Sequence, residues 1–247
     1  MERRKILIVG GTSAIGEQVA RRLAAAGAAL YLTGRDADRL ERSAADLRVR
    51  GATQVETERL DVAQTQRLKN LVGRALDALG GLDTVLFAAG LLPDQNAASE
   101  DAGLLRETLE INAISAMLVL NEAAGVFAHQ GHGQLVAIGS VAGDRGRAAN
   151  SVYGAAKGAL EIFMSGLRQR LQRQGVQVLL VKPGFVDTPM TRDFAKGPLW
   201  ASPDRVAHDI IQAMDRGRSI IYTPWFWRWI MLIIRHIPEG IFKRLSF

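Results

Sequence analysis

The sequence predicts a single α/β domain in which a parallel sheet is covered by helices on both faces. Two observations support this: short runs rich in apolar and β-branched residues alternate with longer amphipathic segments, and a glycine-rich turn directly follows the first run. The expected strands span residues 5–10, 29–34, 54–60, 83–89, 133–140, 176–182 and 219–223. Regular alternation of strand and helix with short connections is typical of a doubly wound, Rossmann-type fold.

Length and composition agree with one such domain. The chain has 247 residues, of which 48% are hydrophobic and 23% charged, so it can bury one sizeable core. It has no cysteine, which excludes disulfides, thiolate catalysis and Cys-ligated metal sites, and we predict no metal site of any kind. We expect residues 1–223 to form the Rossmann-type domain and residues 224–247 to form an amphipathic C-terminal extension.

The two ends of the chain indicate where in the cell the protein is located. The first residues, "MERRKILIVGG", lack the apolar core and cleavage site of a secretory signal. The apolar run at 229–234 is far shorter than the roughly 20 residues that span a bilayer. We therefore expect a cytoplasmic protein without a membrane span.

The excess positive charge is concentrated near the C-terminus. The net charge is +6, and residues 216–247 contain six basic residues and one acidic residue, so this segment carries about five of those charges. Such a distribution argues against a nucleic-acid-binding face spread over the fold, and we expect no nucleic-acid partner. It favours an anionic partner close to the C-terminal segment.

The turn after the first strand is a predicted nucleotide site. It reads "GGTSAIG" over residues 10–16, where Gly10 and Gly16 allow a tight turn and a close helix approach. The free N–H groups and positive dipole end of the following helix would face a pyrophosphate. A glycine-rich turn can also serve packing alone, so this signal is weak without others.

The end of the second strand favours NADP(H) over NAD(H). Sites that prefer NAD usually carry a carboxylate here, which accepts a hydrogen bond from the ribose 2′-hydroxyl. This chain has Gly34 followed by Arg35, and a guanidinium can bind a 2′-phosphate in bidentate fashion. The alternative is that Arg35 is only a solvated charge at a loop tip.

Residues 140–160 contain a predicted proton-transfer site. Tyr153 and Lys157 are four residues apart, which places them on one helix face, and Ser140 follows a strand end. We expect the Lys157 ammonium to move the Tyr153 pKa from about 10 toward neutrality. Tyr153 would then protonate a developing alkoxide, Ser140 would hydrogen-bond the carbonyl oxygen, and Lys157 would also hold the nicotinamide ribose. Taken alone, a Tyr-x-x-x-Lys pair is more often an ordinary surface contact.

Together these motifs resemble the short-chain dehydrogenase/reductase family over essentially the whole chain. The shared elements, in order, are Gly10-x-x-x-Ala14-x-Gly16, Asp61-Val62, Ala88-Ala89-Gly90, Asn112, Ser140, Tyr153-x-x-x-Lys157 and Pro183-Gly184. The resemblance implies that Asn112 holds a water in the proton relay, that Asp61 binds the adenine, and that Thr188 contacts the nicotinamide amide. It further implies cofactor contacts at Thr12, Ser13, Ile15, Val62, Ala89, Gly90, Pro183, Gly184 and Val186.

Two departures from the family pattern affect the cofactor site. Ala14 replaces a usual glycine, and "FAAG" at 87–90 stands where the family often has "NNAG". We expect the first to tighten the pyrophosphate loop and the second to remove amides that brace the sheet. Neither departure involves the predicted proton relay.

A subgroup resemblance suggests a substrate. The stretches "KPGFVDTPMT" and "GPLWASPDRVA" and the Trp-rich basic C-terminus are similar to the decaprenylphosphoryl-ulose 2-reductases and their bacterial relatives. Those enzymes reduce a keto sugar carried on a polyprenyl phosphate. In the family, residues 182–202 form the mobile substrate loop, which makes Met190, Lys196 and Trp200 predicted lid residues, although each could equally serve ordinary packing.

The C-terminal extension has the composition of a membrane-interface segment. If it is helical, Arg228, Arg235, Glu239 and Lys243 form one polar stripe, with Trp225, Trp229, Leu232 and Ile233 facing elsewhere. Pro238 and Gly240 are expected to divide it into two short helices. Trp flanked by Arg and Lys is typical of segments that lie on a membrane. The alternatives are that residues 225–245 close a subunit interface or cover the substrate cleft.

Three functions are therefore open at the level of sequence. The first is an NADPH-dependent ketoreductase for a polyprenyl-linked keto sugar, cytoplasmic and peripheral on the inner membrane face, with a partner oxidase. The second is a soluble carbonyl or hydroxy-compound oxidoreductase whose C-terminal extension serves assembly; in either case we expect a homo-oligomer. The third is a non-enzymatic nucleotide-sensing protein, which the intact set of Asn112, Ser140, Tyr153 and Lys157 disfavours.

Overall fold

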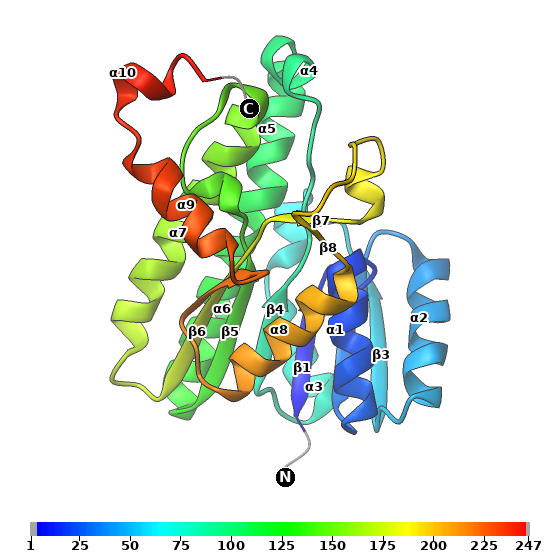
Figure 1. The fold of residues 1–247 in the computed structure, drawn as a ribbon. Coiled ribbons are helices and arrows are strands. Elements are labelled where there is room, and N and C mark those ends of the chain that lie inside the picture. Colours follow the sequence, from blue (N-terminus) through cyan, green and yellow to red (C-terminus); the bar gives the residue numbers. More distant parts are fainter. Residues whose placement is uncertain (1–3, 246–247) are drawn as a thin grey trace.

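Seven parallel strands form the central sheet of the computed structural model, which describes residues 4–245. The strand order is β3-β2-β1-β4-β5-β6-β9 (Figure 1). The bounds are β1 Lys5–Val9, β2 Ala29–Gly34, β3 Gln54–Arg59, β4 Thr84–Phe87, β5 Gly133–Ile138, β6 Val176–Pro183 and β9 Ile220–Thr223. The Rossmann-type prediction is confirmed, and the strand order reverses between β1 and β4, where such folds bind ligands.

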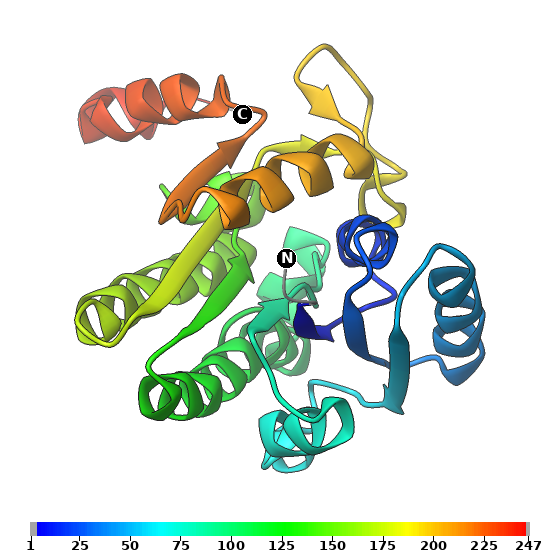
Figure 2. The same ribbon diagram turned by 90° about the horizontal axis from the view of Figure 1, so that it is seen from below.

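Helices cover both faces of this sheet, which gives the three layers of Figure 2. Alternating side chains of β1 face opposite layers: Ile6 and Ile8 pack with one set of helices, and Leu7 and Val9 pack with the other. The first set is α1 (Ala14–Ala25), α2 (Ala37–Val49) and α8 (Pro203–Asp215). The second set is α3 (Leu71–Leu79), α6 (Ser115–Gln130) and α7 (Ser151–Leu171).

All seven predicted strands are present, and some end earlier than expected. The prediction of 83–89 exceeds β4, and that of 133–140 exceeds β5, because the last residues of each run leave the sheet. Those residues, at the carboxyl edge, include Ala89 and Ser140, which belong to the predicted site. In both runs the apolar residues continue beyond the last residue that is hydrogen-bonded to a neighbouring strand. The sequence pattern alone therefore could not place the strand ends.

One helical stretch is long and apolar enough to cross a membrane on length and composition alone. It runs from 102 to 130 through α5 (Ala102–Leu109), the π-helical turn η2 (Glu110–Ile114) and α6. More than half of its apolar window, 56%, is buried inside the fold, and its α6 part packs against the sheet. This degree of burial is typical of a helix in the core of a folded domain.

Smaller elements rise above the carboxyl edge of the sheet. A two-stranded parallel pair joins β7 (Phe185–Val186) and β8 (Trp200–Ala201), with the turn η5 (Pro189–Thr191) in the connection between them. The remaining short elements are η1 (Thr65–Leu68), α4 (Gln95–Glu100), η3 (Val141–Gly143) and η4 (Ala148–Asn150).

The C-terminal segment, described here over residues 224–245, follows β9, and its helix α9 contacts that edge strand (Figure 1). It contains α9 (Trp227–His236) and α10 (Glu239–Phe242), and Pro238 lies between them as expected. The expectation that Gly240 breaks the helix is wrong, because Gly240 lies inside α10. The last two residues of the predicted extension, 246 and 247, lie outside the described residues, as do residues 1–3 of the predicted domain.

Candidate active site

The β1–α1 turn forms a close-packed cradle of backbone. Gly10 has φ +86°, and a Cβ there would lie 2.6 Å from the Ala89 nitrogen. A Cβ on Gly16 would lie 2.6 Å from the Gly10 carbonyl oxygen, so both glycines are required by contact. Ser13 caps the helix, because its Oγ accepts a hydrogen bond from the Gly16 N–H at 3.2 Å. The cradle fits a pyrophosphate at the positive end of α1.

The first departure from the family pattern is accommodated locally. Ala14 is the first residue of α1, where a methyl side chain suits the helical conformation. Thr12 and Ile15, also predicted to contact the cofactor, lie in the same turn, and Ile15 packs against the core.

Three arginines surround the end of β2, and the sequence identified only one of them. Arg35 is exposed directly after β2, and its backbone oxygen accepts a hydrogen bond from Arg59 Nε at 3.2 Å. Arg39, in the first turn of α2, donates from Nη2 to the Thr12 oxygen at 2.8 Å. Arg39 was missed because only the tertiary contact between α2 and the β1–α1 turn brings it here; its four-residue spacing from Arg35 was the available signal.

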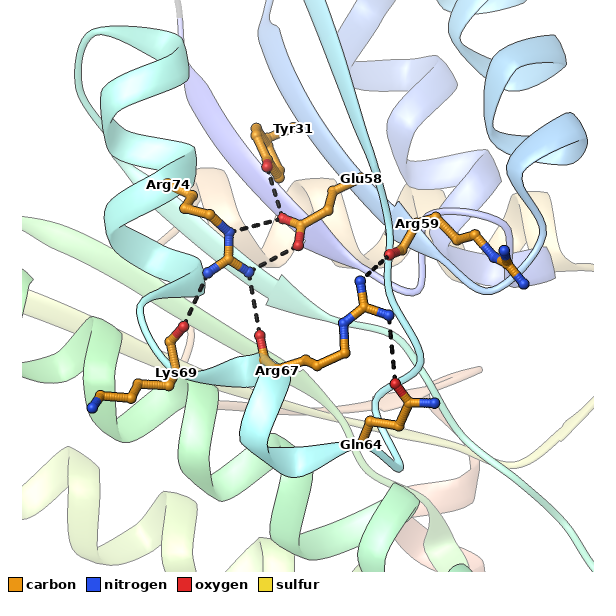
Figure 3. A network of polar contacts seen from close by, with 7 residues as sticks. All are labelled: Tyr31, Glu58, Arg59, Gln64, Arg67, Lys69 and Arg74. Atoms are coloured by element: carbon orange, nitrogen blue, oxygen red, sulfur yellow. Dashed lines mark hydrogen bonds and ion pairs between the residues drawn. The ribbon is translucent and has the colours of Figure 1, made fainter.

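A polar network holds the segment that carries the predicted adenine residues (Figure 3). Glu58 accepts hydrogen bonds from Tyr31 at 2.8 Å and from Arg74 at 2.9 and 3.2 Å. Arg67 donates to the Arg59 carbonyl oxygen at 3.1 Å, which ties η1 back to the end of β3. Burial and the Glu58 carboxylate raise the pKa of Tyr31 to about 12, so its hydroxyl stays a donor.

Asp61 and Val62 follow β3 at the carboxyl edge, between Arg59 and Gln64, which both accept hydrogen bonds from Arg67. The Asp61 carboxylate accepts a hydrogen bond from the Ala63 N–H at 3.0 Å and so stabilises its own turn. Val62 is buried. Adenine binding by this pair stays a prediction.

The catalytic residues predicted from β5 and α7 come together at the sheet edge. Lys157 is buried, with Nζ 5.7 Å from the centre of the Tyr153 ring, and it donates to the Ile138 oxygen at 2.9 Å. Ser140 caps the turn η3, because its Oγ accepts from the Ala142 N–H at 3.1 Å. Gly143 permits the approach of this turn to α7, since a Cβ there would lie 2.8 Å from the Lys157 carbonyl carbon.

The prediction that the Tyr153 pKa moves toward neutrality is wrong for the free chain. Burial raises the Tyr153 pKa to about 12, and a hydrogen bond with Ser140 offsets only part of that increase. Burial also lowers the pKa of Lys157 to about 8, because the ammonium loses its hydration. The sequence argument counted the attraction between the charges and left out the larger cost of removing both groups from water.

Asn112 connects two parts of the site. It is fully buried in η2, and its Nδ2 donates to the Leu91 oxygen at 2.7 Å and to the Thr108 oxygen at 2.9 Å. Its Oδ1 accepts from the Leu91 N–H at 3.2 Å. The side chain therefore fixes the Ala89–Leu91 segment after β4, and its role in a water relay stays a prediction.

The position of Gly90 shows how closely the predicted residues converge. A Cβ there would lie 3.1 Å from Asn112 Oδ1, 3.9 Å from Lys157 Nζ and 4.0 Å from Met190 Cε. Met190 comes from η5, so the predicted substrate loop approaches the Gly90 backbone. A side chain at position 90 would press on Asn112 and fill the space that these groups share.

The other two predicted lid residues pair with each other at the base of the loop. Lys196 lies 4.2 Å from the Trp200 ring centre and forms an ion pair with Asp187 at 2.8 Å. Trp200 stacks on Phe185 at 5.2 Å. Thr188 is the N-cap of η5, and its backbone N–H donates to Thr191 Oγ1 at 3.2 Å; Val186 is buried in β7.

The Pro183–Gly184 turn meets a residue that sequence reasoning assigned elsewhere. Trp227, the first residue of α9, covers Gly184 so closely that a Cβ there would lie 1.9 Å from the indole Nε1. Trp227 also contacts Phe185 edge-on at 5.1 Å and is 3% exposed. Trp227 belongs to residues 225–245, which were expected on a membrane, at a subunit interface or over the substrate cleft. Helical spacing puts Trp227 on a different face from Trp225 and Trp229, but it does not tell which face packs inward. Among residues 4–245, no group of His, Asp and Glu side chains is arranged to hold a metal ion.

Comparisons with known proteins agree with this geometry. The family model described as short chain dehydrogenase matches residues 4–198. The chain is 37% identical over 240 residues to an uncharacterized oxidoreductase of Mycobacterium tuberculosis, covering 97% of this chain and 96% of the relative. It is 36% identical over 247 residues to an uncharacterized oxidoreductase of Streptomyces coelicolor, covering 98% and 96%.

Among solved structures, a short-chain dehydrogenase from Sphingobium yanoikuyae in complex with NADPH has a TM-score of 0.84 at 25% identity. The match covers 98% of this chain and 96% of that one. The bulky-bulky ketone specific alcohol dehydrogenase from Comamonas testosteroni shares the fold, with a TM-score of 0.83 at 22% identity over 100% and 96% of the two chains.

Proposed function

The chain belongs to the short-chain dehydrogenase family, and on that premise we propose that it reduces a ketone with NADPH, using Tyr153 as the proton donor. The observation that most supports this proposal is the convergence of Ser140, Tyr153 and buried Lys157 beside Gly90. A nucleotide-sensing protein would have no need for this proton-transfer set.

Each residue of the site has a separate role in the proposed reduction. A nicotinamide cofactor, when bound, supplies hydride to the carbonyl carbon. Ser140 donates a hydrogen bond to the carbonyl oxygen, and Tyr153 transfers its phenolic proton to that oxygen as it becomes an alkoxide. A Tyr153 pKa of about 12 in the free chain keeps this proton in place. The Lys157 ammonium, 5.7 Å from the ring centre, stabilises the phenolate that remains.

The side chains around the β1–α1 turn suit NADPH. Gly10 and Gly16 leave backbone room for a pyrophosphate at the start of α1. The guanidinium groups of Arg39 and Arg59 bond backbone oxygens on either side of the end of β2, and the exposed Arg35 directly follows that strand, where a 2′-phosphate would lie. A carboxylate at the position of Arg35 would repel that phosphate.

Arg35→Ala should weaken NADPH binding by about 1.5 to 3 kcal/mol, the range for hydrogen bonds to charged groups, and leave NADH binding nearly unchanged. The measurement is a fluorescence titration of both cofactors. Arg42→Ala is the matched control, because Arg42 is an exposed arginine on α2, the helix that follows Arg35. Equal losses for NADPH and NADH would mean that Arg35 supports the loop and does not bind the phosphate.

We further propose that the substrate is a keto sugar carried on a polyprenyl phosphate, supplied by an oxidase. The support is the apolar surface of the C-terminal segment, where Trp225, Trp229 and Ile233 are 65%, 56% and 67% exposed. Ring contacts join this surface to the substrate loop: Trp225 contacts Phe226, Phe226 contacts the buried Trp227, and Trp227 contacts Phe185. A polyprenyl chain stays in the bilayer because each buried CH₂ contributes about 0.8 kcal/mol, so its reductase must come to the inner membrane face.

The exposed face of α9 should bind anionic vesicles. The aromatic side chains would enter the headgroup boundary, and exposed Arg228, Arg235, Lys243 and Arg244 would each gain about 1 kcal/mol from anionic lipid. We expect wild type to co-sediment with phosphatidylglycerol vesicles, less so with added salt, and not with phosphatidylcholine alone. Trp225→Ala/Trp229→Ala should abolish co-sedimentation without a change in oligomer mass.

The control is Ile162→Ala, which removes an equally exposed apolar side chain, 76% exposed, from α7. A wild type that ignores vesicles, with a double variant that dissociates into smaller species, would make this face a subunit interface. That result would favour the alternative of a soluble carbonyl or hydroxy-compound oxidoreductase assembled through its C-terminal segment.

The substrate proposal itself is tested by turnover. Polyprenyl-phosphoryl keto sugars are compared with water-soluble ketones, each with NADPH and detergent. We expect a higher kcat/KM for the lipid-linked sugars, because the apolar surface is joined through Trp227 to Phe185, beside the substrate loop. Preference for the water-soluble ketones would reject the lipid-linked substrate and retain the reductase.

A further inference from the structure

The C-terminal segment contacts the catalytic loop at the residue next to the serine. Val141, which follows Ser140, is 4% exposed because Trp227 and Met231 of α9 cover it. These three residues form a hydrophobic cluster of their own, separate from the two clusters that lie against the sheet. The loop that carries Ser140 therefore packs on one side against the C-terminal segment.

Arg145 makes a second connection between the same loop and the same segment. Its Nη1 donates to the Ile234 oxygen at 2.7 Å and to the Ile237 oxygen at 2.6 Å. Its Nη2 forms an ion pair with Glu239 at 2.9 Å, and its guanidinium carbon lies 3.6 Å from the centre of the Phe242 ring. The Arg145 side chain is 15% exposed.

An arginine suits this position for a physical reason. The last carbonyls of a helix have no partner within the helix, and they carry the negative end of its dipole. A guanidinium has several donors in a fixed plane, so Arg145 can bond the end of α9 and the start of α10 together. A lysine ammonium has no such planar set of donors.

Between these two contacts, the loop is held by a buried ion cluster. Asp144 binds the ammonium of Lys182, whose side chain is 2% exposed and also binds Glu161 of α7. Tyr222 of β9 donates to the second Asp144 oxygen at 3.0 Å, and its ring packs against the cluster of Trp227 and Met231. The loop from 140 to 145 is thus bound to α7, β6, β9 and α9 together.

Helix α9 also contacts the other side of the predicted nicotinamide site. Trp227 lies on Gly184, directly after the end of β6. One helix therefore touches two separate chain segments that carry predicted site residues, the Ser140 loop and the Pro183–Gly184 turn. The outer face of the same helix is the exposed apolar surface described above.

We infer that the C-terminal segment contributes to catalysis by holding the Ser140 loop in place. Arg145 is the positioning residue that joins this segment to the loop. The inference rests on the proposed reductase function. A misplacement of about 1 Å in a catalytic group can cost on the order of 10²-fold in rate. Loss of Arg145 should therefore lower kcat, while the nucleotide cradle of the β1–α1 turn keeps its affinity.

The test is a double-mutant cycle between Arg145 and Ser140. Arg145→Ala should lower kcat by about 10- to 100-fold, with the NADPH dissociation constant within about twofold of wild type. In a Ser140→Ala background, the same change should lower kcat by less than about threefold, because the group that Arg145 positions is already gone. Losses that multiply in the double variant would overturn the inference, as would a folded Arg145→Ala with wild-type kcat.

Two further variants keep the test decisive. Arg50→Ala removes an Arg–carboxylate pair of similar length, 2.8 Å to Asp46, at the end of α2, and should leave kcat unchanged. Arg145→Lys keeps the charge and should show an intermediate kcat; it replaces Arg145→Ala in the cycle if the alanine variant does not fold. Wild-type kcat in a folded Arg145→Lys would count against a role for the planar donor set.

Hydrogen exchange separates this inference from the proposed function. In Arg145→Ala, amides of residues 140–146 should exchange faster by about 10-fold or more, while those of α1 keep their protection. If neither wild type nor Arg50→Ala reduces any ketone, the proposed function fails. Exchange then still decides whether Arg145 holds the Ser140 loop, and unchanged protection at 140–146 would show that it does not.

Discussion

Tyr153→Phe should lower kcat for ketone reduction by at least about 10²-fold, the scale of general acid catalysis, with little change in NADPH affinity. The substitution keeps the ring that packs beside Lys157 and removes only the proton donor. Burial holds the Tyr153 pKa near 12 in the free chain, so at neutral pH the wild-type hydroxyl carries its proton and the variant has none to give. Steady-state kinetics and a cofactor titration measure the two quantities.

Tyr31→Phe is the matched control for this prediction. It also removes a phenolic hydroxyl whose pKa burial raises to about 12, but that hydroxyl bonds Glu58 in the network of Figure 3. Its kcat should stay close to wild type. Turnover near the wild-type rate in Tyr153→Phe would remove Tyr153 from the mechanism and leave the proposed reaction without its proton donor.

Trp227→Ala should lower the free energy of unfolding by about 3 to 5 kcal/mol, the range for loss of a buried aromatic side chain. The indole is 3% exposed and is enclosed by Gly184, Phe185 and Val141, which cannot close the space it leaves. Denaturant unfolding followed by circular dichroism gives the change directly. Because the lost contacts lie at the site, residual activity should fall as well.

Trp225→Ala gives the comparison on the same segment. Trp225 is 65% exposed, so its removal should change the free energy of unfolding by no more than about 0.5 kcal/mol. Similar losses in both variants would mean that α9 does not pack as described. The contrast also explains why the vesicle test uses Trp225 and Trp229 and leaves Trp227 in place.

Local patterns in the sequence were sufficient for the fold and for several of the side chains that the structure brings together at the predicted site. Strand and helix periods predicted all seven strands, because side-chain alternation over a few residues decides which elements can form. The glycines of the β1–α1 turn were found for the same reason, since Gly10 needs φ +86° and Gly16 needs close contact within seven residues. Tyr153 and Lys157 were found because four residues make one helical turn.

Other parts of the site depended on contacts between distant segments and on burial. The contact of Arg39 with Thr12 spans 27 residues, and that of Arg145 with Ile234 spans 89. The direction of the Tyr153 pKa depended on how deeply α7 sets that residue beside the sheet. Neither a distance across the fold nor a degree of burial can be obtained from spacing along the chain.

The C-terminal segment shows most clearly which features follow from the sequence and which depend on the tertiary structure. Its sequence determined an amphipathic, basic, Trp-rich helix with a break at Pro238, because these properties follow from composition and local spacing. Only the tertiary structure decided that Trp227 turns inward onto Gly184 while Trp225 and Trp229 stay exposed. The physical reason is that helical spacing sets which side chains share a face of the helix and leaves open which of the faces packs inward. What distinguishes them is the surface against which α9 packs, and that surface is built by β6, β9 and the Ser140 loop.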